Sequence, residues 1–244
     1  MAHFSDEGIA LRAIRLGETD RIVTFLTREN GKVRAVAKGV RRPKNRIGAR
    51  VEPLSHVTMM CWRGRDLDTI SQVELLESFR AIRSDLDRMG PAITMLEIVD
   101  QVALERHESA ELFTMLLGAL RALENRASPV LLGAFCFKLL ALEGVGPIVE
   151  HCVNCEGEGP FVAFDASAGG LLCIDCRRGQ SVSGKVVDYL QILGHGGLAR
   201  LLEEPSGQAS IAFERLGIET VEHHLGRRLR SAHSALEGER SSHY

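Results

Sequence analysis

The chain has 244 residues, of which 45% are hydrophobic and 25% charged, a composition typical of globular proteins. No stretch approaches eighteen consecutive apolar residues, so no membrane span and no membrane partner are expected. The net charge of −2 conceals an asymmetry, because residues 1–80 carry 15 Lys and Arg against 10 Asp and Glu, whereas the other 164 carry 15 against 22. Residues 1–7 lack the basic start and apolar run of a secretory signal. We therefore expect a cytoplasmic protein whose basic first third contacts a polyanion.

The first eighty residues have the alternating pattern of five short strands separated by turns. The expected strands are residues 8–15, 21–27, 33–38, 53–62 and 69–75. The pair Asn30-Gly31, which separates the second and third of them, is the strongest short hairpin signal in a sequence. Five short strands at this spacing predict a small barrel.

A run of cations accompanies the third expected strand. From Arg28 to Arg50 the chain has nine Lys and Arg and one acid, Glu29. Glycine and proline make much of the run flexible, and its cations repel one another unless a polyanion neutralises them. Because small barrels of this type bind single-stranded nucleic acid, we interpret the run as a phosphate-binding surface. The alternative is a solvated basic loop without a special role.

Aromatic residues on which nucleobases could stack are few in this region. Phe25 and Trp62 are the candidates, and either could instead belong to the core. We therefore expect binding that depends on electrostatics more than on stacking, with little sequence preference.

The rest of the chain, apart from one short segment, has the period of α-helices. The expected helices are residues 91–106, 108–125, 128–143, 186–193 and 208–236. Ser128 is expected to cap the third helix, with Pro129 in its first turn, and this helix is apolar nearly all round, which predicts burial. Arg227, Arg228 and Arg230, near the end of the last helix, complement the helix dipole or contact a further phosphate.

Four cysteines interrupt the helical pattern at the spacing of a zinc site. Cys152 and Cys155 form one C-x-x-C pair, Cys173 and Cys176 form the other, and seventeen residues separate the pairs. Four thiolates close a tetrahedron with no position for water, so the zinc would be structural. Two disulfides or a redox pair are weaker alternatives. His151 could replace one sulfur, but we interpret it as an exposed flanking residue.

Three stretches of the sequence resemble RecO, a family of bacterial DNA repair proteins that act as recombination mediators. They are residues 17–27, residues 31–44 and residues 140–155, which in order and spacing cover most of the chain. The resemblance implies an oligonucleotide-binding (OB-fold) barrel, a helical domain and a zinc-finger module within the latter.

The expected fold class is therefore α+β. An N-terminal five-stranded OB-fold barrel precedes an α-helical domain that carries the zinc-finger module as an insertion. The expected boundaries are residues 1–80 for the nucleic-acid-binding barrel, 81–150 and 181–244 for the helical domain, and 151–180 for the inserted module.

The resemblance further implies a function in DNA repair after DNA damage and in homologous recombination through the RecF pathway. It implies a protein that binds single- and double-stranded DNA, anneals complementary strands and, with RecR, helps to load RecA onto DNA coated by the single-stranded-DNA-binding protein. The acidic C-terminal tail of that coating protein is a further implied partner. The protein is then nucleoid-associated and not an enzyme. The DNA-binding residues implied by the resemblance are Arg34, Lys38, Arg41, Arg42, Lys44 and Arg46.

Two other functions stay open. A zinc-stapled adaptor for protein assembly would contact DNA only incidentally, and the acidic helical part of the chain is compatible with it. A nuclease would need a carboxylate cluster such as Asp66, Asp68 and Glu74, but ordinary exposed acids are far commoner. The sequence also has neither a phosphate-binding Gly-rich loop nor a nucleophile elbow.

Overall fold

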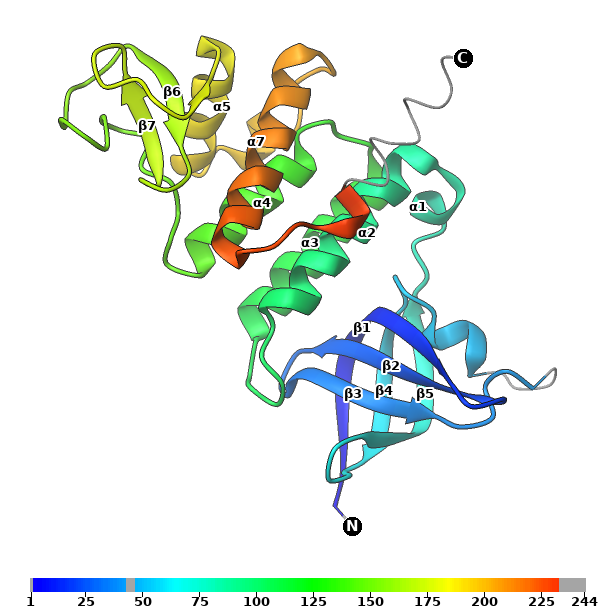
Figure 1. The fold of residues 1–244 in the computed structure, drawn as a ribbon. Helices are drawn as coiled ribbons and strands as arrows, with labels where there is room; N and C mark the ends of the chain where they lie inside the picture. The colour runs from blue at the N-terminus through cyan, green and yellow to red at the C-terminus, as the bar shows by residue number, and fades with distance from the viewer. Residues whose placement is uncertain (1, 43–46, 233–244) are drawn as a thin grey trace. The chain divides into compact units, whose positions relative to one another are not determined.

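The computed structural model describes residues 2–42 and 47–232, and the chain divides into two compact units between Asn125 and Arg126 (Figure 1). Two of the expected DNA-binding residues, Lys44 and Arg46, lie outside the described residues. Each unit is considered separately below. None of the helices in the described ranges is both long and apolar enough to span a membrane.

The first unit contains a closed barrel of five strands, which confirms the predicted fold class. The strands are β1 (His3–Leu16), β2 (Asp20–Thr27), β3 (Gly31–Ala37), β4 (His56–Trp62) and β5 (Asp68–Glu77). Their order is β1-β2-β3-β5-β4, and β3 pairs with β5 in parallel whereas the other neighbours are antiparallel. Phe25 is fully buried in the barrel core, so it cannot stack on a nucleobase.

In its described part the first unit also contains the short 3-10 helix η1 (Gly48–Val51) and three α-helices: α1 (Arg80–Ser84), α2 (Leu86–Val102) and α3 (Ala110–Asn125). The expected start of α2 near residue 91 was wrong. The Asp85 side chain accepts a hydrogen bond from the backbone N–H of Asp87 at 2.9 Å and so caps the helix four residues before Gly90-Pro91. Pro91 therefore lies inside α2, where it removes one backbone donor without ending the helix.

The turn between β2 and β3 confirms the predicted hairpin at Asn30-Gly31. Gly31 has a φ of +60°, and a Cβ atom there would lie 1.7 Å from the carbonyl oxygen of His107. The loop between α2 and α3 lies this close because the backbone N–H of Lys32 donates to the carbonyl oxygen of Leu104 at 3.1 Å. Glycine is therefore required here both by the turn and by the neighbouring loop.

The second unit packs helices against a small sheet. Its helices are α4 (Leu131–Leu142), α5 (Gly184–Gly194), α6 (Leu198–Leu201) and α7 (Gln208–Leu225). Its strands are β6 (Phe161–Asp165), β7 (Gly170–Cys173) and β8 (Gln180–Ser181), in the order β7-β6-β8. Helix α4 is buried on nearly all sides, as its sequence predicts, and it packs closely on α7 because Gly133 and Gly217 face each other.

Two expectations for helix ends in the second unit were wrong. Val130 rather than Ser128 precedes α4, and the Ser128 hydroxyl instead donates to the carbonyl oxygen of Leu202 at 3.3 Å. Helix α7 ends at Leu225, well before residue 236, because Gly226 adopts a left-handed conformation with a φ of 65°. Arg227 and Arg228 are exposed just beyond this end. The expected domain boundaries stay predictions.

Candidate metal centre and nucleic-acid surface

The four cysteines of the two C-x-x-C pairs lie together in the second unit. The sulfur atoms of Cys152, Cys155, Cys173 and Cys176 all lie within 4.8 Å of one another, and those of Cys155 and Cys173 are 3.7 Å apart. In a tetrahedral site with Zn–S bonds of about 2.3 Å, two sulfurs are about 3.8 Å apart, whereas a disulfide bond measures about 2.05 Å. All four are free thiols. The arrangement therefore fits a metal ion held by four sulfurs.

Backbone pairing brings the two halves of the site together. Ile148 forms a parallel bridge with Gly170, and the backbone N–H of Val153 donates to the carbonyl oxygen of Leu171 at 3.0 Å. Gly170 permits this approach, because a Cβ atom there would lie 2.4 Å from the Ile148 carbonyl oxygen. The segment that carries Cys152 is thus hydrogen-bonded alongside β7, the strand that ends at Cys173.

The backbone also favours a thiolate at Cys152. Burial raises the pKa of this thiol, but the backbone N–H groups of Cys173, Asn154 and Cys155 outweigh burial and lower the pKa to about 6. A thiolate is the form that binds a metal. His151 does not join the cluster, although it is half-buried rather than exposed.

The segment around the cysteines has a very small apolar core of its own. Its buried cluster consists of Cys152, Ala163, Leu172 and Cys173, with a few partly buried neighbours. So small a core provides little of the free energy needed to order a loop-rich segment, which metal binding can supply. One further contact ties the segment to the helices, since the ring centroids of Phe164 and Phe137 lie 6.1 Å apart.

A relay of polar side chains supports one of the four sulfurs. The Asn154 side-chain amide donates to the sulfur of Cys176 at 3.3 Å. Arg178 in turn donates to the Asn154 amide oxygen at 3.2 Å and to the Asp165 carboxylate at 2.7 Å. The hydroxyl of Ser167 and the Arg178 guanidinium hold the pKa of Asp165 well below its usual range. Sequence reasoning missed this relay because its members lie on strand β6 and on two separate loops of the chain.

We expect the relay to slow the loss of the metal. The variants Asn154→Ala and Arg178→Ala should each weaken metal affinity by about 10- to 100-fold, because groups that orient metal ligands contribute on this scale. Release of the metal to a chromogenic chelator measures the effect. Arg177→Ala is the matched control, since Arg177 is the exposed neighbour of Arg178. Equal release rates from the Arg178 and Arg177 variants would refute a supporting role.

The expected DNA-binding cations of the first unit fall into two groups. Lys38, Arg41 and Arg42 are exposed in the loop that follows β3. Arg34 lies within β3 itself, where its guanidinium is 3.7 Å from the Glu105 carboxylate and its Nε atom is buried without a hydrogen-bond partner. Three of the cations are thus exposed in one loop, whereas the guanidinium of Arg34 lies on the strand beside Glu105.

Hydrogen bonds fix the position of these exposed cations. The Arg41 guanidinium donates to the carbonyl oxygen of Glu18 at 2.8 Å, and the Asp20 carboxylate accepts from the backbone N–H of Gly39 at 2.8 Å. This bond to Gly39 lowers the pKa of Asp20, with contributions from Thr19 and from the nearby cations. The carbonyl oxygen orients Arg41 without neutralising its charge.

Comparison with known proteins decides the family. A family model described as "Recombination protein O N terminal" matches residues 1–79, and one described as "Recombination protein O C terminal" matches residues 83–233. The chain belongs to the RecO family. The first match contains the barrel and its exposed cations, and the second contains all four cysteines of the metal centre.

Curated relatives agree with this assignment. A DNA repair protein RecO from a Nocardioides species is 45% identical over 187 residues, which are 74% of this chain and 77% of the relative. The RecO of Frankia casuarinae is 39% identical over 202 residues, or 80% of this chain and 83% of the relative. The RecO of Thermobifida fusca is 40% identical over 186 residues, which are 75% of this chain and 76% of the relative. RecO membership places the chain in DNA repair and recombination.

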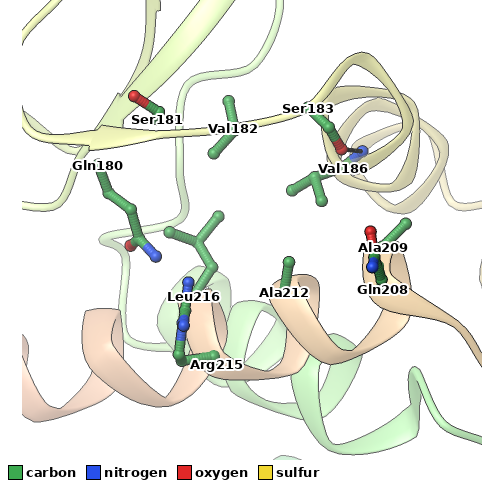
Figure 2. Close-up of a pocket in the computed structure, with 10 residues that line it drawn as sticks. All are labelled: Gln180, Ser181, Val182, Ser183, Val186, Gln208, Ala209, Ala212, Arg215 and Leu216. Carbon is green, nitrogen blue, oxygen red and sulfur yellow. Dashed lines mark hydrogen bonds between the residues drawn. The ribbon is translucent and has the colours of Figure 1, made fainter.

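A hollow of about 220 Å³ in the second unit lies between β8, the start of α5 and α7 (Figure 2). Arg215 is the only charged residue among those drawn in the figure, and no carboxylate, imidazole or thiol lines the hollow. The Ser183 hydroxyl already accepts the backbone N–H of Val186 at the start of α5. The hollow therefore lacks the paired acid and base, or nucleophile and base, on which most hydrolytic sites depend.

Proposed function

We propose that this RecO protein is a recombination mediator that binds single- and double-stranded DNA with little regard to sequence and anneals complementary strands. With RecR, it helps to load RecA onto DNA coated by the single-stranded-DNA-binding protein, whose acidic C-terminal tail it contacts. The observation that carries the DNA-binding part is the exposed group Lys38, Arg41 and Arg42 at the end of a closed barrel. Lys44 and Arg46 extend the same run along the chain. Arg34 is expected to take part once a phosphate replaces Glu105.

The proposed mechanism of annealing is charge neutralisation. Two complementary strands repel each other through their phosphates, and a basic surface that binds both reduces this repulsion. Contacts to phosphates leave the Watson–Crick edges of the bases free to pair. In this mechanism the guanidinium of Arg41 is already oriented before DNA binds, because neutral carbonyl oxygens rather than a carboxylate accept its hydrogen bonds.

Salt dependence tests this mechanism. If about six phosphates are engaged, the logarithm of the affinity for a single strand should fall with the logarithm of salt concentration at a slope of roughly −4. The double charge reversal Arg41→Glu with Arg42→Glu should flatten the slope and reduce the annealing rate, without changing the metal content. Fluorescence anisotropy of a labelled oligonucleotide measures the slope.

A matched control for this variant lies in the second unit. Arg126→Glu with Arg200→Glu makes the same change in net charge at two exposed positions outside the barrel. This control should retain the wild-type slope. A flat response of the wild-type protein to salt, or equal losses in both double variants, would show that the barrel cations do not hold the DNA backbone.

We further propose that the ion at the four cysteines is a structural Zn²⁺. The donor set favours it, because four thiolates in a tetrahedral arrangement suit zinc. Such a site leaves no position for a reacting water, so the ion would order the segment between α4 and α5 rather than take part in chemistry.

One observation favours a second role, that of a zinc-stapled adaptor for protein assembly. Leu142, Val145 and Ile148 of the second unit are 37%, 48% and 41% exposed, and a group of exposed apolar side chains is typical of a protein-binding surface. Binding of the purified protein to an oligonucleotide separates the two roles. A protein that binds DNA only in the presence of its protein partners would be the adaptor.

A further inference from the structure

The four cysteines of the metal centre differ in their exposure to solvent. Cys152 is fully buried and Cys173 is 7% exposed, whereas Cys176 is partly exposed and Cys155 is exposed. A cysteine binds a metal as the thiolate, which is also its nucleophilic form, and oxidants attack the thiolates that solvent reaches. Exposure therefore restricts such an attack to Cys155 and Cys176.

A polar side chain covers one of these two sulfurs. The Asn154 side-chain amide donates to the sulfur of Cys176 at 3.3 Å, and the Arg178 guanidinium holds this amide in place by donating to its oxygen at 3.2 Å. A hydrogen bond donated to a thiolate lies on its lone pairs and reduces its reactivity, and the amide also occupies space beside the sulfur. Cys176 is thus the better protected of the two.

A glycine leaves the other sulfur open. The backbone N–H of Gly157 donates to the sulfur of Cys155. A Cβ atom on Gly157 would lie 3.4 Å from this sulfur and, among the described residues, would meet nothing else within 4 Å beyond its chain neighbours. The space beside the Cys155 sulfur is therefore free of side chains, so a small oxidant can approach it there.

The sulfur of Cys173 lies close enough to complete an oxidation that begins at Cys155. The two sulfur atoms are 3.7 Å apart, and Cys173 is fixed at the end of β7. A cysteine that has been oxidised to the sulfenic acid condenses with a neighbouring thiol to form a disulfide. The metal centre thus places an exposed sulfur beside a buried one that can resolve it.

We propose that the metal centre is a redox-sensitive site, at which hydrogen peroxide oxidises Cys155 and Cys173 resolves the product. The Cys155 thiolate attacks a peroxide oxygen, the O–O bond breaks, and hydroxide leaves and takes up a proton to become water. The Cys173 thiolate then attacks the sulfur of the sulfenic acid, the S–O bond breaks, and a second hydroxide leaves and is protonated. Two thiolates thus lose two electrons and become one disulfide, while one peroxide and two protons become two waters.

The disulfide would remove two of the four sulfurs that hold the ion, and the ion orders the segment between α4 and α5. Ile148 depends on this segment, because its backbone N–H donates to the carbonyl oxygen of Gly169 at 2.9 Å and its carbonyl oxygen accepts from Leu171 at 3.0 Å. Ile148 also belongs to the exposed apolar group considered above as a protein-binding surface. Oxidation should therefore disturb that surface and leave the barrel, which belongs to the other unit, folded.

The test uses the full-length protein loaded with zinc, because the proposal rests on the structural Zn²⁺ proposed above. Hydrogen peroxide should release the zinc to a chromogenic chelator, and peptide mapping by mass spectrometry should find a disulfide between Cys155 and Cys173. Hydrogen exchange should become fast across residues 150–182 and stay slow in the barrel. A reductant added together with zinc should restore the centre.

Two results would overturn the proposal while leaving the zinc assignment intact. One is a centre that keeps its zinc in excess peroxide, and the other is zinc release with a disulfide that does not join Cys155 to Cys173. A protein that never binds zinc would overturn the metal assignment as well. The failure of the redox site is therefore distinguishable from the failure of the metal centre on which it rests.

Two substitutions that keep all four cysteines test the role of access. Gly157→Ala places a methyl group beside the Cys155 sulfur, so it should slow zinc release by peroxide about two- to fivefold with unchanged zinc content. Gly184→Ala is the matched control, because a Cβ atom there would meet nothing within 4 Å. Asn154→Ala uncovers Cys176, so a limiting amount of N-ethylmaleimide should alkylate Cys176 as well as Cys155. Equal release rates from the two glycine variants, or alkylation of Cys176 before Cys155 in the unsubstituted protein, would refute attack at Cys155.

Discussion

Replacing Cys152 with serine should abolish tight metal binding and unfold the segment between α4 and α5, while the barrel stays folded. Cys152 is fully buried and forms part of the only apolar cluster that this segment has of its own among the described residues. Metal binding to such sites is worth about 10–16 kcal/mol, which far exceeds what so small a core contributes. Serine offers a hard oxygen in place of a thiolate, so the tetrahedral site is lost.

Two measurements check this result. Metal analysis of the purified protein should fall from one equivalent of zinc to almost none, and hydrogen exchange should become fast across residues 150–182. Cys61→Ala is the control, because Cys61 lies in the barrel core and burial raises its pKa to about 12, which keeps it a neutral thiol. A Cys152→Ser protein that retained a full equivalent of zinc would contradict the four-sulfur assignment.

Replacing His56 with leucine should destabilise the first unit by about 3–5 kcal/mol, the usual cost of removing one partner from a buried ionic cluster. The imidazole is 1% exposed, with its Nε2 atom 2.7 Å from the Glu7 carboxylate and its Nδ1 atom 2.8 Å from that of Glu77. Both ring nitrogens therefore lie within hydrogen-bond distance of a carboxylate. Leucine would leave the two acids facing an apolar group.

The cluster extends outward through two arginines, which supply a control. Arg28 pairs with Glu7 at 3.1 Å, and Arg121 pairs with Glu77 at 2.6 Å. Arg121→Leu removes only the outermost ion pair of the cluster, whose arginine side chain is 53% exposed. This variant should therefore lower the free energy of unfolding by no more than about 1 kcal/mol. Urea unfolding followed by the fluorescence of Trp62, which lies in this unit, measures both variants. A His56→Leu protein as stable as the Arg121→Leu protein would show that the cluster does not stabilise the fold.

The pH dependence of stability should change in the same variant. Burial raises the pKa of Glu7, but the hydrogen bonds from Arg28 and His56 outweigh it and leave the pKa below 4.5. The hydrogen bond from Arg121, aided by that from His56, lowers the pKa of Glu77 despite its burial. The stabilisation from both acids is therefore complete above pH 4.5 and is lost as pH falls through their lower folded pKa values. The His56→Leu protein should lose part of this acid sensitivity.

Patterns confined to a few neighbouring residues were predicted well. The strands of the barrel, the hairpin at Gly31 and the four-cysteine centre follow from side-chain alternation, turn chemistry and knuckle spacing. The ends of α2, α4 and α7 were predicted poorly. Helix α2 begins at the capping residue Asp85 and α7 ends at the left-handed Gly226, and both compete with nearby proline and helical signals. At α4 the hydroxyl of Ser128 bonds to Leu202 and does not cap the helix.

Pairings between distant residues were not visible in the sequence. Residues 3–7 extend β1 only because they pair with β4, more than fifty residues later. Arg34 lies beside Glu105, about seventy residues later in the chain. The relay from Asp165 to Cys176 joins the end of β6 to two separate loops.

The sequence by itself determined that this protein has a small barrel, a four-cysteine centre and a concentrated run of cations. Each of these depends on bond geometry and side-chain type within a few residues, which any fold of the chain must respect. Only the tertiary structure decided which cations lie beside an acid, which acids surround His56 and which side chains support the sulfur of Cys176. Those outcomes depend on register and packing between distant segments, and these are set by the free energy of the whole unit rather than by any one stretch.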